Sequence, residues 1–178
     1  MKTIKIGLII LLNIVLLSWG GTMFYKNYKL NQARENLKSS ASYTKLKNQL
    51  KFWSDTYSLP VPDLEFRFNH SNEGFYNPSS VSITVLTTME EWENQEFLEA
   101  LLAHEFGHHY ISFRLHDLNA EDAELGADFI ARDLVGLEKY TKALSKGLER
   151  PSDESHMSAE QRIEILNQYP DNHILEPN

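Results

Sequence analysis

The stretch LEALLAHEFGHHYISF, residues 98–113, decides how this chain is organised. Its His104, Glu105 and His108 form a His-Glu-x-x-His motif within an apolar run that predicts a buried helix. Side chains four residues apart on a helix project from one face about 6 Å apart, so the two imidazoles can bind one zinc ion. Glu105 can then act as general base toward a water molecule at the metal. An ordinary buried helix with hydrogen-bonded histidines is the alternative.

The composition limits the kind of metal site and the kind of partner. The 178 residues include no cysteine, so a zinc site must use histidine and carboxylate ligands. The formal net charge is −8, and residues 1–34 contain five basic and no acidic residues, so all 25 acidic residues follow them. A domain this acidic would repel phosphates, and we therefore expect no nucleic-acid partner.

An uncharged segment, IGLIILLNIVLLSWGGTMFY at residues 6–25, predicts one N-terminal transmembrane helix. It has about the 20 residues that a helix needs to cross a bilayer, and lysines flank both of its ends. We assign residues 1–30 to an uncleaved signal anchor and residues 31–42 to a polar stalk. The expected location is the cell membrane, single-pass, with the domain extracytoplasmic. A cleaved signal peptide is the alternative, because Ser18-Trp19-Gly20 is a passable small-x-small cleavage site.

The remainder is expected to form an α+β domain over residues 43–170, followed by a flexible tail over residues 171–178. Helical spacing of apolar residues predicts four further helices, over residues 43–57, 120–136, 136–150 and 159–169. Alternation predicts strands over residues 64–68 and 81–85, which we expect in a small antiparallel sheet. Residues 69–80, rich in Asn, Ser, Gly and Pro, predict a loop or hairpin.

Two helix starts have capping signals. Thr88 with Glu91 forms a capping box, which predicts that the motif helix begins at residues 87–88. The neighbouring glutamates suit the positive end of a helix and need no ligand to explain them. Ser158 with Gln161 predicts the cap of the last helix.

A third ligand is needed, because catalytic zinc usually has three protein ligands and one open position. The predicted helix over residues 120–136 carries Glu124 and Asp128 four residues apart on one face. A helical hairpin would bring that face to the motif. We therefore predict Glu124 as the ligand and Asp128 as an acceptor that fixes the tautomer of a ligand imidazole. Glu121 is the rival ligand, and an exposed acidic face is the alternative.

The other histidines are given no ligand role. His70, His116 and His173 stand alone in loop or tail contexts and are expected at the surface. His109 comes five residues after the first motif histidine, a poorer helical spacing than that of the second. We expect His109 beside the ligands or exposed to solvent.

These motifs resemble a known family. HEFGH followed by Glu-Leu-Gly-Ala-Asp at residues 124–128 is similar to the gluzincin signature, His-Glu-x-x-His then Glu-x-x-Ala-Asp. The resemblance is greatest to the integral-membrane group typified by the HtpX heat-shock protease, the CAAX prenyl protease and the mitochondrial protease Oma. Residues 155–163, SHMSAEQRI, are similar to that family's Ser-x-His-Pro-x-x-x-x-Arg-Ile element, with Met157 in place of the proline.

The resemblance implies a zincin-like (gluzincin) helical core and a zinc endopeptidase with Zn²⁺ as cofactor. It implies His104, His108 and Glu124 as metal ligands and Glu105 as catalytic base. Asp128 would not bind the metal itself but would contact one of the ligands.

The same resemblance implies residues around the cleft. His156 would be a catalytic residue that helps to stabilise the oxyanion, and Arg162 would lie near it. The strand before the motif helix would be the edge that pairs with the substrate backbone, and Gly74, Phe75 and Tyr76 are the candidate substrate-binding residues.

The expected partners are a protein or peptide substrate and the membrane. One predicted span and a small domain make this a minimal version of the family, which disfavours prenylated or multi-span substrates. From a different functional class, the alternative is a catalytically silent or latent zinc-binding domain that serves as a scaffold or protein-binding module.

Overall fold

The computed structural model describes residues 40–68, 73–88, 92, 94–115, 118–147 and 157–169. Contacts divide the chain into residues 1–39 and residues 40–178, and every described residue belongs to the second unit. The predicted anchor, all of the stalk before residue 40 and the tail lie outside the described residues. Among the helices that are described, none is both long and apolar enough to cross a membrane.

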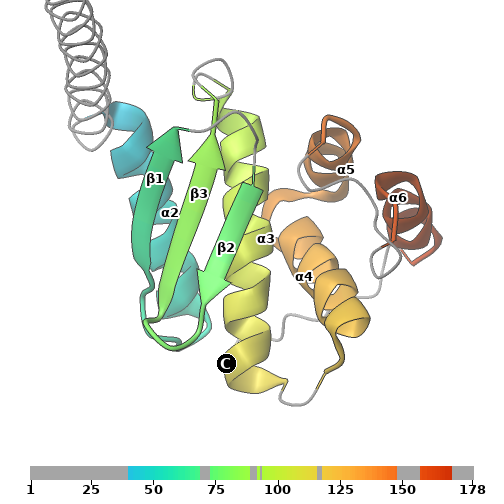
Figure 1. The fold of residues 1–178 in the computed structure, drawn as a ribbon, viewed down its shortest axis with the longest axis horizontal. Coiled ribbons are helices and arrows are strands. Elements are labelled where there is room, and N and C mark those ends of the chain that lie inside the picture. Colours follow the sequence, from blue (N-terminus) through green and yellow to red (C-terminus); the bar gives the residue numbers. More distant parts are fainter. Residues whose placement is uncertain are drawn as a thin grey trace, which may run out of the picture. The chain divides into compact units, whose positions relative to one another are not determined.

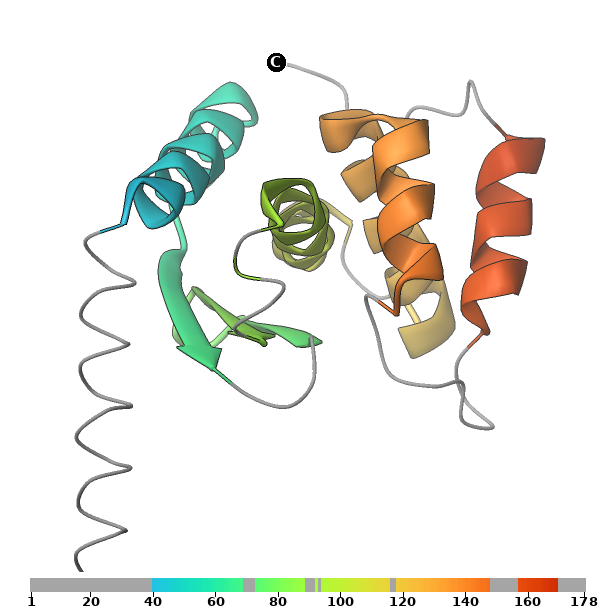
Figure 2. The same cartoon turned by 90° about the horizontal axis from the view of Figure 1, so that it is seen from above.

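The predicted α+β class is confirmed for this part of the chain. Its elements in order are α2 (Ala41–Thr56), β1 (Asp63–Phe68), β2 (Glu73–Asn77), β3 (Ser82–Thr87), α3 (Gln95–Arg114), α4 (Ala120–Val135), α5 (Leu137–Ser145) and α6 (Ala159–Gln168). Helix α3 lies in the middle, with the sheet and α2 on one side and α4 and α5 on the other (Figure 1, Figure 2). One face of α3 therefore packs against the sheet and α2, and another packs against α4 and α5.

The sheet is mixed, so the prediction of an antiparallel sheet is wrong. Its strand order is β1-β3-β2, with β1 parallel and β2 antiparallel to β3. Of the two structures predicted for residues 69–80, a loop or a hairpin, the hairpin is confirmed, because β2 pairs antiparallel with β3. The Gly and Asn content of this stretch is typical of turns and did not indicate the extent of the strand. The strand before the motif helix, β3, is central, so it is not the edge; β2 lies at the edge beside it.

The sheet buries one face only. Leu64 and Phe66 of β1 and Ile83 and Val85 of β3 belong to the hydrophobic core, and their alternating neighbours on the strands are more exposed. Figure 2 shows α2 and α3 on the same side of the sheet. Pleating therefore directs every second residue of each strand toward α3 or α2.

The motif helix α3 begins later than predicted. Asn94 is its N-cap, accepting a hydrogen bond from the Phe97 backbone N–H at 3.2 Å. The predicted start at residues 87–88 is wrong, because Thr87 belongs to β3, where parallel pairing opposite Phe68 extends the strand. The capping partner Glu91 lies outside the described residues.

The other helices agree with the prediction. Helices α2 and α4 cover the predicted ranges, whereas α5 ends at Ser145, earlier than predicted. Gly136 joins α4 to α5 with φ of 91°, a conformation that favours glycine. The capping box of α6 is confirmed, since Ser158 and Gln161 bond reciprocally.

Helices α3 and α4 make an unusually close contact at Gly107. A Cβ atom placed there would lie 2.7 Å from Ala127 Cα and 2.8 Å from Ala127 O, both backbone atoms. Backbone atoms cannot rotate away as a side chain can, so only glycine permits this approach.

We predict that Gly107→Ala lowers the free energy of unfolding by roughly 1–3 kcal/mol, the usual cost of overpacking a core. The matched control is Gly126→Ala on α4, whose new Cβ would meet only side-chain atoms, the nearest being Ile111 Cδ1 at 3.1 Å. Urea unfolding followed by circular dichroism measures both. Equal midpoints for the two variants would contradict the close contact.

Candidate metal centre

Three predicted ligands converge where α3 meets α4. His104 and His108 lie one turn apart on α3, with their Nε2 atoms 3.1 Å from each other. Glu124 on α4 places Oε2 3.4 Å from His104 Nε2 and Oε1 3.3 Å from His108 Nε2. His104 is almost fully buried, whereas the His108 and Glu124 side chains are 21% and 29% exposed. Solvent therefore reaches the cluster from the His108 and Glu124 side.

The spacing of these atoms can be compared with a zinc site. Zinc–nitrogen and zinc–oxygen bonds of about 2.0–2.1 Å in a tetrahedron put ligand atoms about 3.3–3.4 Å apart. The 3.1 Å between His104 Nε2 and His108 Nε2 is close to that edge, and the two nitrogens each have a different oxygen of Glu124 nearby, at 3.4 Å (Oε2) and 3.3 Å (Oε1). A set of two imidazoles and one carboxylate also suits zinc and leaves a fourth position. The residues fit a zinc ion.

Asp128 organises the side of the cluster that faces the core. Its carboxylate is fully buried and lies 3.1 Å from His104 Nδ1. Arg162 of α6 donates from Nε at 2.6 Å and also from Nη2. A proton on His104 Nδ1 faces this carboxylate, so the Nε2 lone pair of the neutral ring points to Glu124 and His108.

Tyr140 of α5 completes this arrangement, and sequence reasoning missed it. Its hydroxyl donates to Asp128 Oδ1 and lies 2.9 Å from His104 Nδ1. The sequence places Tyr140 only on the apolar face of a helix. A fully buried tyrosine needs a hydrogen-bond partner, which is the signal that could have raised it as a candidate.

The charges of the cluster are tightly coupled. Burial alone would raise the pKa values of Glu124 and Asp128, but histidine contacts lower the first and Arg162 with His104 lowers the second. Burial alone would lower the pKa of His104, yet Tyr140, Asp128 and Glu124 raise it well above its ordinary value. Both carboxylates are therefore ionised at neutral pH, and protons compete with a metal for His104.

Glu105 lies next to the cluster and beneath the edge strand. The residue is 4% exposed, and burial raises the pKa of its carboxyl group. Its carboxylate accepts a hydrogen bond from the Tyr76 backbone N–H. A Cβ at Gly74 would overlap that carboxylate, so strand β2 can lie this close only with glycine there.

The structure brings two of the three candidate substrate-binding residues to Glu105. Gly74 and Tyr76 face α3, as their contacts with Glu105 show. Phe75 lies between them, so strand alternation turns its 41% exposed side chain to the open face of the sheet. Phe75 is not brought to the cluster.

The remaining predicted residues have mixed outcomes. The rival ligand Glu121 is exposed and does not belong to the cluster. Of the two alternatives for His109, exposure to solvent is wrong, because the residue is fully buried, and burial lowers its pKa. Its ring nitrogens bond Tyr76 and Pro60, neither of which is a candidate ligand. His156 lies outside the described residues, as do three other histidines, His70, His116 and His173.

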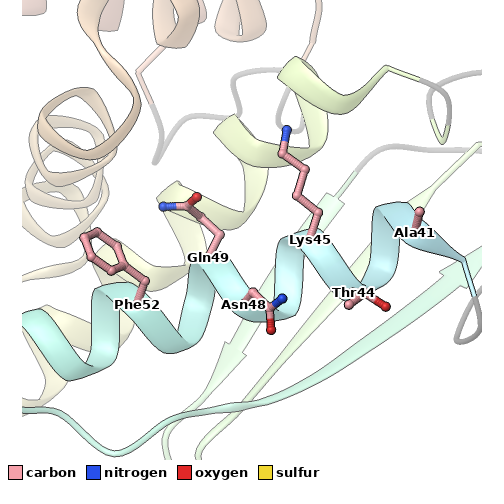
Figure 3. A pocket seen from close by; sticks show the side chains of 6 residues that line it. All are labelled: Ala41, Thr44, Lys45, Asn48, Gln49 and Phe52. Carbon is pink, nitrogen blue, oxygen red and sulfur yellow. The ribbon is translucent and has the colours of Figure 1, made fainter.

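A surface pocket elsewhere plays no part in this arrangement. Figure 3 shows it on the outer side of α2, and its lining residues are Ala41, Thr44, Lys45, Asn48, Gln49 and Phe52. All six come from one helix, and none belongs to the metal cluster.

Comparison of the chain with protein-family models, with curated proteins and with solved structures finds no match in any of the three. The geometry of the site therefore carries the functional argument.

We predict that Asp128→Asn weakens zinc affinity by about 10- to 100-fold, the usual effect of losing the partner of a ligand histidine. Tyr140→Phe should have a smaller effect in the same direction. The matched control is Asp133→Asn, since Asp133 pairs with Arg132 on the same helix and lies outside the cluster. Competition with a chromogenic chelator measures affinity. Unchanged affinity in Asp128→Asn would contradict this role.

The raised pKa of His104 predicts how zinc affinity depends on pH. A ligand must lose its proton before it binds, so affinity is greatest above the histidine pKa and falls as pH decreases through it. Because this pKa lies well above its ordinary value, the fall should begin above pH 6.5. Chelator titrations at a series of pH values measure it. A fall confined to pH values below about 6 would be inconsistent with the raised pKa.

Proposed function

We propose that the protein is a zinc-dependent endopeptidase of the gluzincin class, anchored to the membrane by its N-terminal segment. The observation that carries the proposal is the grouping of His104, His108 and Glu124, whose ligand atoms lie within 4.8 Å of one another, with Glu105 beside them. The motif order in the sequence supports the same class. The proposed substrate is a protein or peptide.

The metal-binding residues in this proposal are His104, His108 and Glu124. When bound, zinc supplies Lewis acidity, which polarises a carbonyl group and makes water acidic near neutral pH. Asp128 and Tyr140 hold a His104 proton on Nδ1, so Nε2 is the nitrogen that would bind the metal.

Glu105 is proposed as the general base. Its carboxylate accepts a proton from water as the water oxygen bonds to the carbonyl carbon of the scissile peptide. The same carboxyl group then gives that proton to the leaving nitrogen as the carbon–nitrogen bond breaks. One water is consumed, and a carboxylic acid and an amine are released. The raised pKa of the buried Glu105 suits a group that must both take and return a proton.

The edge strand β2 gives the substrate a place to lie. Hydrogen-bonding groups alternate along an antiparallel strand, and the Tyr76 N–H points to Glu105 and not to β3. The backbone groups of Gly74 and Tyr76 therefore face the free edge. An extended peptide can pair with that edge by β-augmentation, which recognises backbone more than sequence. An endopeptidase needs this kind of recognition.

The alternative is a silent or latent zinc-binding domain. The observation that favours it is the burial of Glu105 against Gly74 and the Tyr76 N–H, which occupies the base with a bond of the chain's own. A purely structural zinc site usually has four protein ligands, whereas the residues that the structure describes offer three here. The experiment below separates these readings.

We predict that the full-length chain, purified in detergent, binds about one zinc ion and cleaves casein or an unbiased peptide library. Glu105→Gln should keep the zinc, because Glu105 is not a ligand, and should lower kcat/KM by roughly 10²–10⁴-fold. His108→Ala is the control that loses both. Atomic absorption measures zinc, and mass spectrometry of the peptides measures cleavage.

Each outcome has one meaning. Zinc in both the native chain and Glu105→Gln, with cleavage only in the native chain, supports the endopeptidase. Zinc without cleavage in either supports the silent or latent alternative. Absence of zinc from the native chain after incubation with the metal excludes the proposed site.

A further inference from the structure

His109, the residue after the second motif histidine, joins three parts of the fold. Its ring is fully buried on α3, and its Nε2 lies 2.9 Å from the carbonyl oxygen of Pro60. Its Nδ1 lies 3.1 Å from the hydroxyl of Tyr76 on β2. The connector before β1, the motif helix and the edge strand therefore meet at one imidazole.

The direction of these hydrogen bonds is fixed by chemistry. A carbonyl oxygen only accepts, so His109 Nε2 carries a proton and donates to Pro60. In the neutral ring Nδ1 is then an acceptor, and the Tyr76 hydroxyl donates to it. Ser112, one turn further along α3, also bonds the Tyr76 hydroxyl. Tyr76 is thus held by two residues of α3.

Aromatic rings enclose this imidazole. Tyr76, Phe106 and Phe113 lie 5.2, 5.6 and 5.0 Å from it between ring centroids. A ring packed on three sides and bonded through both nitrogens has little freedom to move. The imidazole can therefore hold the Tyr76 hydroxyl in a fixed position relative to α3.

The strand held in this way is short and has one strand neighbour. β2 contains five residues and pairs only with β3 in the sheet. The contact between β2 and α3 determines how far Gly74 and Tyr76 lie from Glu105. A five-residue edge strand without that bond could shift relative to the helix by a fraction of an ångström. Shifts of about 1 Å at a reacting centre already cost large factors in rate.

We propose that His109 is a positioning residue that, through Tyr76, fixes the substrate-pairing strand β2 over Glu105 and the metal cluster. This inference rests on the proposed function, because it assigns β2 the task of aligning an extended peptide. His109 touches neither the substrate nor the metal in this scheme. Its effect should therefore depend on how much of the substrate pairs with β2.

The test compares two substrates in the full-length, zinc-loaded chain. One is an extended peptide selected from the cleaved library, and the other is a short blocked fragment that keeps only the two residues flanking its cleaved bond. Tyr76→Phe and His109→Leu should each lower kcat/KM for the extended peptide by roughly threefold to tenfold, the value of one hydrogen bond. The short fragment should change by less than twofold, and zinc content should not change.

Three comparisons sharpen the test. His109→Gln retains a donor and an acceptor and should lose less than His109→Leu. The double variant Tyr76→Phe with His109→Leu should lose less than the product of the two single losses, because both single changes remove the bond between Tyr76 and His109. Tyr43→Phe is the matched control, since its hydroxyl bonds Leu64 O of β1 at 3.1 Å, at the other edge of the sheet.

A second readout does not require cleavage. Relative to the native chain, Tyr76→Phe should accelerate amide hydrogen exchange more in β2 than in β1. Tyr43→Phe should accelerate it more in β1 than in β2. If the native chain cleaves nothing, the endopeptidase proposal fails, and exchange alone decides whether His109 holds β2. Equal losses for both substrates, fully additive variants, or unchanged exchange in β2 would each overturn the positioning role.

Discussion

The contact between the backbones of α3 and α4 at Gly107 and Ala127 is the constraint on which the site depends. Glu124 lies three residues before Ala127, nearly one helical turn, so this contact sets how far its carboxylate reaches toward α3. The separations of 3.3 and 3.4 Å from the two histidines leave no room for a wider helix pair. Any side chain at Gly107 would separate the helices and the ligands together. A change in the packing of α3 against α4 would therefore also change the distances within the cluster.

A single buried carboxylate extends that coupling to the rest of the helical layer. Asp128 on α4 contacts His104 of α3, Tyr140 of α5 and Arg162 of α6. A buried charge that loses its partner is strongly destabilising, by about 3–5 kcal/mol. The docking of α6 and the orientation of the His104 ring thus depend on the same group. Helices α5 and α6, which contribute no candidate ligand, therefore still influence the chemistry of the cluster.

The sequence predicts the parts of this structure that are encoded locally. Helices α2, α4 and α6 follow from apolar periodicity, with a capping box for α6, and the grouping of His104, His108 and Glu124 follows from spacing on two helices. Sheet sense, the extent of strand β2 and the start of α3 could not be predicted, because each is decided by pairing with a distant segment. For the same reason, two hydrogen-bond partners of histidines on α3 could not be predicted. Tyr140 lies 36 residues from His104 and Tyr76 lies 33 from His109, and no local pattern connects them.

The adjacent residues His108 and His109 lie on two different faces of the motif helix. Consecutive residues on a helix point about 100° apart, so His108 faces α4 while His109 faces β2. Glu105 lies between these directions, beside the cluster and beneath the strand. Peptide hydrolysis requires that the group accepting the proton and the scissile carbonyl keep a fixed relation. In the proposed enzyme, one helix would carry the candidate ligands, the base and the bond to the edge strand, and would maintain that relation without help from loops. Helix α3 therefore does more than group candidate ligands, because His108 and His109 face two different surfaces.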